Sequence, residues 1–252
     1  MDYNRVFIRG DTHGDFSWLP IWCEKTNTSI KDCLIILGDA GILYYGSNSK
    51  KEKELKSFIS HQKITVLCVR GNHEDRPSSR EEMKYVSFNN SPDSTDGYYY
   101  EEEYPNILYL YDGSIFNINN KRFLAIGGAY SVDKEYRLLM RYKWVSDEEL
   151  NIGEMFDILC KLKNDSNHQF DFVLTHTCPI GCIPTDLFLS GIDQSKVSNR
   201  MENFLDNVAN VIDFKHWYSG HFHDNRKNIQ YVRSHCGQGD ISMLFDEIIQ
   251  II

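Results

Sequence analysis

Polar residues that could bind metal ions follow several short apolar runs, at the point where each run ends. The set consists of Asp11, His13, Asp39, Asn72, His176, His221 and His223. Short runs rich in Val, Ile and Leu that end in glycine and polar residues are typical of buried strands. Because ligands bind outside the carboxyl ends of parallel strands, we expect these side chains to converge on one edge of a sheet.

The donor atoms of this set indicate which ions it could bind. Carboxylate oxygen, amide oxygen and imidazole nitrogen together suit borderline divalent metals, namely Mn, Fe, Co, Ni or Zn. The set is too large for one tetrahedral site. It is large enough for two ions that share a bridging carboxylate, as in hydrolases whose ions lie roughly 3.5–4 Å apart. The sequence therefore predicts two divalent metal ions as the cofactor, with manganese as one candidate.

One further histidine, His73, stands beside Asn72. A ring with no metal to bind, at the edge of such a site, is placed to protonate a leaving oxygen. We therefore predict that His73 is the general acid of a hydrolytic reaction. The sequence carries no Cys or Ser nucleophile motif that would indicate a covalent intermediate.

Strands and helices alternate in the first half of the chain. Apolar runs predict strands over residues 6–8, 33–37 and 64–69, and apolar residues at helical spacing predict a helix over 50–62. Strand, loop and helix in repetition predict a layered α/β fold with a mostly parallel core.

Further along, Ser146 with Glu149 three residues later has the pattern of a capping box, which predicts that a helix begins near Ser146.

Residues 78–104 differ in composition from the rest of the chain. They are polar and rich in Asn, Asp, Ser and Tyr, with consecutive tyrosines at 98–100. We expect an inserted loop or flap here, within a single domain that spans residues 1–252. The tyrosines could form a base-stacking platform or a strand of the insert, and the strand is favoured.

The charge balance bears on the class of partner. The 252 residues include 27 Lys and Arg against 36 Asp and Glu, which gives a net charge of −9. A long nucleic acid needs a basic face, so this balance argues against one as a partner. A small anion held by a local cationic site is compatible with it.

Cysteine usage and hydropathy indicate the compartment. The chain has seven cysteines, with no CxxC pair and no even framework, which fits a reducing environment with free thiols. No apolar run reaches the roughly 18 residues that a membrane-spanning helix requires. The N-terminus leads directly into a predicted strand, without a signal peptide. We expect a cytoplasmic protein with no membrane partner.

The candidate residues occur in ordered motifs, namely GDTHG over 10–14, GDAG over 38–41, GNHE over 71–74, His176, and GHFH over 220–223. In this order they resemble the signature of the calcineurin-like metallophosphoesterases, and the glycine-rich motifs around Asp11 and Asn72 favour the Ser/Thr-phosphatase-like bacterial branch. The resemblance implies a four-layer α/β/β/α sandwich with two mixed sheets. It also implies a dinuclear metal site at the C-terminal ends of the strands.

The resemblance also implies a role for each residue. One ion would be held by Asp11, His13, Asp39 and His223. The other would be held by Asp39, Asn72, His176 and His221, with Asp39 bridging. His73 resembles the family's general acid. The implied reaction is in-line attack on phosphorus by a metal-bound hydroxide, with His73 assisting the leaving group.

The second motif departs from the pattern GDxVDRG of Ser/Thr protein phosphatases. Ile42 replaces the acidic partner of the catalytic histidine, and Leu43 replaces the phosphate-binding arginine. A protein-phosphatase activity therefore loses two parts of its machinery. Glu74 or Asp75 could orient His73 instead, or could be exposed loop carboxylates.

A phosphate needs a cationic clamp besides the metals, and arginine is the planar bidentate choice. Arg76 stands four residues after Asn72, and Arg137 ends the stretch GGAYSVDKEYR, which resembles one found in bacterial members of the family. We predict Arg76 and Arg137 as substrate-binding residues; the alternative for each is a solvated helix face. His235 is a further candidate, for which a structural role is favoured.

The sequence therefore predicts a metal-dependent phosphoesterase that hydrolyses phosphomonoesters, with a small phosphorylated molecule or a phosphoprotein as substrate. The alternative is a phosphodiesterase that acts on cyclic nucleotides, dinucleotides or nucleic acid. A non-catalytic scaffold is disfavoured, because every ligand position of the signature is filled.

Overall fold

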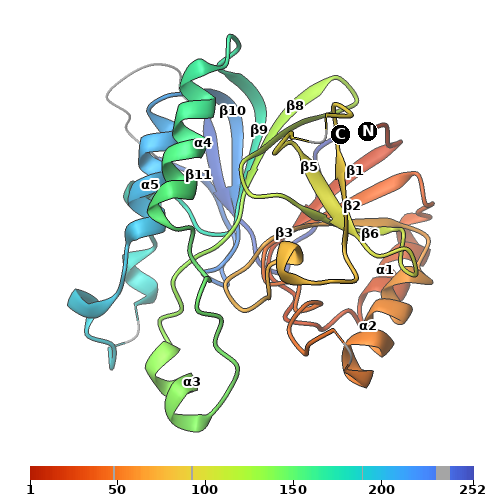
Figure 1. Ribbon diagram of the computed structural model, residues 1–252, viewed down its shortest axis with the longest axis horizontal. Helices are drawn as coiled ribbons and strands as arrows, with labels where there is room; N and C mark the ends of the chain where they lie inside the picture. Colours follow the sequence, from red (N-terminus) through yellow and green to blue (C-terminus); the bar gives the residue numbers. More distant parts are fainter. Residues whose placement is uncertain (48, 92, 189, 231–238) are drawn as a thin grey trace.

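Two mixed β-sheets lie face to face in the middle of the molecule, and helices cover their outer faces (Figure 1). The computed structural model describes residues 1–252 except 48, 92, 189 and 231–238. The layers follow the α/β/β/α order that the resemblance implied, so the predicted fold class is confirmed.

The first sheet has a parallel centre and antiparallel edges. Its strand order in the described part of the chain is β13 (Ile249–Gln250), β1 (Arg5–Arg9), β2 (Asp32–Leu37), β3 (Thr65–Val69), β6 (Ile107–Leu110), β5 (Gly97–Tyr100) and β4 (Lys84–Ser87). Parallel pairing joins β1, β2, β3 and β6. β2 is buried along its whole length, because helices cover one face of the sheet and the second sheet covers the other. Such a strand reads as an uninterrupted apolar run, which is why the sequence alone predicts it.

The second sheet repeats this plan. Among the described residues its order is β11 (Arg226–Ile229), β12 (Asp240–Met243), β10 (Asp213–Ser219), β9 (Gln169–Thr175), β8 (Lys121–Ile126) and β7 (Ser114–Ile118). Parallel pairing joins β12, β10, β9 and β8, and antiparallel strands close both edges. The turn between β7 and β8 places Asn119 and Asn120 in the left-handed region, which matches the twist of a two-residue hairpin.

Helices pack on the outer face of each sheet. The α-helices of the described residues are α1 (Leu19–Thr26), α2 (Lys50–Ser60), α3 (Lys134–Met140), α4 (Ile152–Asn164) and α5 (Arg200–Ala209). α1 and α2 cover the first sheet and α4 and α5 the second, whereas α3 projects away from both (Figure 1). No helix within the described ranges is both long and apolar enough to cross a bilayer.

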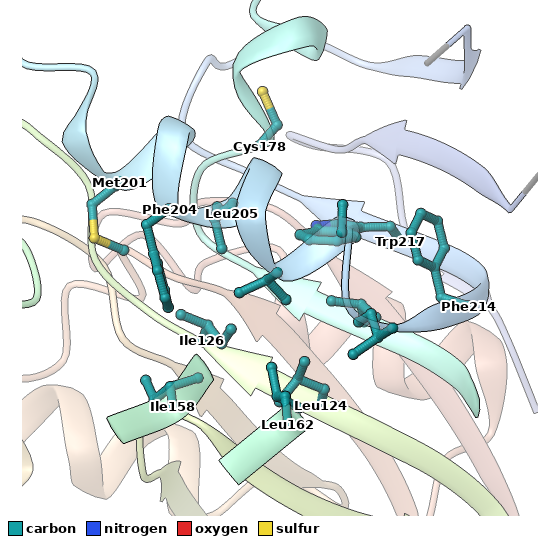
Figure 2. Packing of buried hydrophobic residues seen from close by; sticks show 14 of the residues in the cluster. Leu124, Ile126, Ile158, Leu162, Cys178, Met201, Phe204, Leu205, Phe214 and Trp217 are labelled. Carbon is teal, nitrogen blue, oxygen red and sulfur yellow. The ribbon is translucent and has the colours of Figure 1, made fainter. Parts of the chain in front are cut away.

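An apolar core on each side of the second sheet fixes the layers. Between the sheets, the rings of Phe123 and Phe172 stack with their centroids 4.8 Å apart. On the outer side, Ile158 and Leu162 of α4 pack over Leu124 of β8 (Figure 2). Each such side chain contributes about 1.5–3 kcal/mol when it is fully buried, so α4 is held firmly on the sheet that carries part of the site.

The helix predicted to begin near Ser146 begins later, and this prediction is wrong. α4 starts at Ile152, and Asn151 is its N-cap, with a reciprocal capping box to Glu154. The residues before it bind a distant segment instead, since the carbonyl oxygens of Asp147 and Glu149 accept hydrogen bonds from the Arg76 guanidinium. These contacts come from distant segments, and the capping-box pattern at Ser146 contains no sign of them.

Residues 78–104 lie at the edge of the first sheet rather than forming a separate flap. β4 and β5 pair as an antiparallel hairpin, and β5 pairs with β6. Tyr98 and Tyr100 pack against the core between the sheets, while Tyr99 packs on the opposite face. The tyrosine run is therefore a strand, as favoured, with its rings alternating between the two faces as the pleat requires.

Candidate metal centre

The predicted ligands lie in loops that follow parallel strands of both sheets. β1 is followed by Asp11 and His13, β2 by Asp39, β3 by Asn72 and His73, β9 by His176, and β10 by His221 and His223. Because the two sheets present these carboxyl ends at the same edge, side chains from both converge there. The structure thus brings together the whole predicted ligand set and His73.

Asp11, His13 and His223 form the first cluster. Their ligand atoms lie within 4.8 Å of one another, and the Nε2 atoms of the two rings are 2.8 Å apart. Asp11 Oδ1 accepts a hydrogen bond from the backbone N–H of His221 at 2.8 Å. Its other oxygen, Oδ2, is buried with no hydrogen-bond partner among the described residues. A charged oxygen left free beside two imidazoles fits a divalent cation, so the residues present suit the metal.

Asp39 lies between this cluster and a second one. Its Oδ1 accepts a hydrogen bond from the backbone N–H of His73 at 2.9 Å. Its Oδ2 lies 3.9 Å from His13 Nδ1 and 3.7 Å from His176 Nε2. Asp39 thus lies beside a ring of each cluster, and its ligand atom is within 4.8 Å of those of Asp11 and His176.

The second cluster adds an amide and two rings. Asn72 Oδ1 lies 2.7 Å from His176 Nε2, and the rings of His176 and His221 are 4.9 Å apart between centroids. His176 Nδ1 lies 2.8 Å from the carbonyl oxygen of Leu37. A ring nitrogen this close to a carbonyl carries the proton, so Nε2 is left with a lone pair for a metal.

The close approach of the strands requires glycine. A Cβ atom on Gly38 would lie 2.1 Å from His176 Nδ1, and one on Gly220 would lie 2.4 Å from Asp11 Oδ1. Several ligands are themselves in the left-handed region, which costs energy for residues other than glycine. These are His13, Asp39, His221 and His223. The surrounding structure holds the loops in the conformation that points their side chains inward.

The protonation states suit metal binding. Burial alone would raise the pKa of Asp11, but the nearby His176 and His223 rings and the hydrogen bond from the His221 backbone hold it at about 2. Burial, together with His176, lowers the pKa of His221 to about 3. An ionised carboxylate and a neutral imidazole are the forms that bind divalent ions.

His73 and Arg137 meet at the margin of the centre. His73 Nε2 lies 3.2 Å from Arg137 Nη2 and 3.9 Å from Asp39 Oδ2. Burial lowers the pKa of His73, and the Arg137 charge acts in the same direction. Asp133 accepts from Arg137 Nε at 2.7 Å, which holds the guanidinium beside the ring.

Arg76 is not part of the site, so its predicted role in substrate binding is corrected. Its guanidinium pairs with Glu154 and Asp147, and it lines a different cavity, of about 610 Å³, against α4. The turn after Asn72 points it toward the start of α4, where carboxylates and carbonyl oxygens satisfy its donors. His235 lies outside the described residues.

Glu74 and Asp75 are engaged away from His73. Glu74 is buried and accepts from the backbone N–H of Ile42 at 3.0 Å, and burial raises its pKa to about 7. Asp75 pairs with Arg80 and Lys143. The acidic partner missing from the second motif is therefore not replaced by either of them.

A cavity of about 410 Å³ opens beside the ligands. Asp39, Asn72, His73, His221 and His223 line one side of it. The other side is largely apolar, formed by Ile183, Leu187, Phe188, Ile192, Val197 and Phe222. A molecule bound there would place a polar end at the ligands and an apolar part against this wall.

Three buried residues of the site are not among those predicted from the sequence. Ser131 accepts a hydrogen bond from Asn72 Nδ2 at 2.8 Å and donates to Glu148. Glu202 accepts from Thr177 at 2.7 Å and lines the cavity. Ser131 does stand in the GGAYS stretch quoted for Arg137, but neither glutamate follows a strand, so no positional signal marks them.

Comparison with known protein families shows which family the chain matches. A family model described as "Calcineurin-like phosphoesterase" matches residues 5–225, which covers the ligands from Asp11 to His223. No curated protein matches the chain.

The pH dependence of stability should change when Glu202 is replaced by its isostere. Burial raises the pKa of Glu202 from 4.5 to about 7, so the folded state holds a proton that the unfolded state has lost between these values. Its contribution to stability is full below pH 4.5 and is lost as the pH rises through about 7. Gln cannot ionise, so Glu202→Gln should gain roughly 1–3 kcal/mol relative to wild type across this range.

Urea unfolding of the metal-free protein at a series of pH values measures this difference. A stability difference between Glu202→Gln and wild type that stays constant with pH would contradict the assignment.

Proposed function

Starting from the calcineurin-like phosphoesterase family, to which the chain belongs, we propose that this hydrolase acts on phosphomonoesters. The family's members hydrolyse phosphate esters with a dinuclear divalent metal centre, and the Asp and His groups of this chain could hold those ions. We propose a small phosphorylated molecule or a phosphoprotein as the substrate and manganese as a metal that supports the reaction.

The observation that carries the proposal is the contact between Arg137 and His73 at the margin of the centre. A phosphomonoester carries a charge of about −1.5 to −2 near pH 7, whereas a diester carries only one negative charge. A guanidinium placed beside the site supplies an additional cation. Its Nε and Nη1 atoms donate to Asp133 and to the Lys143 carbonyl oxygen, so Nη2, beside His73, is the donor for a phosphoryl oxygen. This extra positive charge supports the monoester over the diester.

Arg137 and His73 have distinct parts in this reaction. When bound, the two ions would neutralise phosphoryl oxygens and lower the pKa of water. Arg137 would bind an oxygen of the phosphoryl group and orient it. The negative charge of the substrate would favour the protonated form of His73, which could then donate its proton to the leaving oxygen.

The cavity supports a substrate with an apolar part. Leu187 and Phe188 lie in its wall opposite His73, and about 410 Å³ is enough for a small ester or a phosphorylated side chain. The net charge of −9 would repel a long polyanion, which supports the exclusion of DNA and RNA. The free thiols of the described cysteines support a reducing, cytoplasmic compartment.

With manganese supplied, the purified chain should hydrolyse 4-nitrophenyl phosphate with a higher kcat/KM than bis(4-nitrophenyl) phosphate. Added charge at Arg137 favours the dianion, and removal of the metal with a chelator should abolish both activities. Steady-state rates at matched metal concentration measure the preference. A higher kcat/KM for the diester would replace the proposal by the phosphodiesterase alternative.

His73→Gln should lower kcat by roughly 100- to 10,000-fold, because the leaving oxygen would lose its proton donor. The loss should be larger for phenyl phosphate than for 4-nitrophenyl phosphate, since the poorer leaving group depends more on protonation. Manganese affinity, measured by calorimetry, should change little because His73 is not among the ligands. Equal losses on the two esters would argue against a general acid.

Arg137→Ala and Arg76→Ala form a matched pair. Arg137→Ala should lower kcat/KM for a monoester by about 10- to 100-fold, because a charge-assisted hydrogen bond to the phosphoryl group is lost. Arg76→Ala should leave kcat/KM near wild type and lower thermal stability, because it removes the ion pairs to Glu154 and Asp147. A larger kinetic defect in Arg76→Ala would reverse the assignment.

A further inference from the structure

We infer that Ser131 and Glu148 are positioning residues that fix the orientation of the Asn72 amide at the metal centre. The inference concerns the geometry of the centre and holds whichever phosphate ester is the substrate. It rests on a directed chain of hydrogen bonds from Asn72 through Ser131 to Glu148, whose side chains are almost fully buried.

The chain of hydrogen bonds has a buried carboxylate at its end. Asn72 Nδ2 donates to Ser131 Oγ at 2.8 Å, and the Ser131 hydroxyl donates to Glu148. Glu148 also accepts from the backbone N–H of Ser131 at 3.2 Å and from Trp144 Nε1 at 2.8 Å. Asn72, Ser131 and Glu148 are each at most 3% exposed. With these donors around it, Glu148 acts as an acceptor only.

The direction of these bonds follows from that carboxylate. The Ser131 hydroxyl has one proton, which it uses in the hydrogen bond that it donates to Glu148. Ser131 Oγ can then offer only lone pairs to Asn72, so the NH₂ end of the amide must face Ser131. The oxygen end is thereby turned toward the centre, where Oδ1 lies 2.7 Å from His176 Nε2.

A reversed amide would not serve as a ligand. The two ends of an amide differ little in size, so packing alone does not select one of them, and only the oxygen has lone pairs for a cation. If Asn72 turned over, its NH₂ group would point at the metal position and at His176. The hydrogen-bond chain is therefore what selects the orientation that binds metal.

The same carboxylate also anchors the segment that carries Arg137. Glu148 binds Ser131 at one end of residues 131–148, and α3 within that segment has no buried residue of its own. Figure 1 shows α3 projecting away from both layers. Because little of this segment is in the core, its placement depends on a few polar contacts, namely those of Glu148 with Ser131 and the ion pair of Lys143 with Asp75. Glu148 thus supports Asn72 directly through Ser131 and Arg137 through the closure of the segment.

The first test is the manganese affinity of the metal-free full-length chain carrying Ser131→Ala, measured by isothermal titration calorimetry. Loss of the acceptor for Asn72 Nδ2 should weaken the binding of one manganese ion by about 10- to 100-fold. Ser131→Thr keeps the hydroxyl and should restore most of the affinity. Ser114→Ala is the matched control, since Ser114 is fully buried and hydrogen-bonds to Thr95 and Gly97 away from the centre.

The second test is Glu148→Gln, which keeps the shape of the side chain and replaces one acceptor oxygen with a donor. A donor facing Ser131 would reverse the direction of the hydroxyl and favour the wrong amide orientation. We expect weaker manganese binding in this variant, and a lower kcat even at saturating metal because Arg137 is less well held.

Wild-type manganese affinity in Ser131→Ala would overturn the inference, whether or not Glu148→Gln folds. Equal losses in Ser131→Ala and Ser114→Ala would also overturn it, because they would show a general effect of removing a buried hydroxyl. A chain that binds manganese as described but hydrolyses no phosphate ester would contradict the proposed function and leave this inference standing.

Discussion

Two buried carboxylates impose the requirement that the rest of the site meets. Asp11 and Asp39 are almost fully removed from water, and a buried charge without a partner is costly. In each, Oδ1 accepts a backbone N–H from a loop on another strand, His221 for Asp11 and His73 for Asp39. In each, Oδ2 is directed toward the ring nitrogens instead. The protein thus satisfies one oxygen of each pair and leaves the other for a cation.

The hydrogen bonds to these carboxylates explain why the site needs both sheets. The donor for Asp11 comes from the loop after β10, in the second sheet, while Asp11 itself follows β1 in the first. The sheets must approach closely enough for that bond to form, and Gly220 permits it because a Cβ atom there would collide with Asp11. The core between the sheets, with its stacked phenylalanines, holds the two layers at that separation. The packing of the core between the sheets therefore sets the separation that the metal centre at their edge requires.

The sequence predicts the parts of this arrangement that depend on local pattern. β2 reads as an apolar run because it is buried on both faces, and ligands at strand ends are recognisable from their position. The later start of α4 and the ion pairs of Arg76 depend on contacts between distant segments. Arg76 donates hydrogen bonds to carbonyl oxygens of the residues that precede α4. Ser131 and Glu148 act only through hydrogen bonds that exist once the chain is folded. No spacing rule links a serine to a glutamate across the α3 segment.

The substitutions in the second motif change where a phosphate clamp can come from. Ile42 and Leu43 are fully buried in the core beneath α1 and α2, so these two positions supply neither a partner for His73 nor a guanidinium to the centre. In our proposal Arg137 provides the cation, and it comes from the segment between β8 and α4 instead. That segment is fastened at its base by Glu148 and exposed along α3. The binding of the phosphoryl group and the orientation of Asn72 then depend on the same buried carboxylate, so a change at Glu148 should alter metal binding and catalysis together.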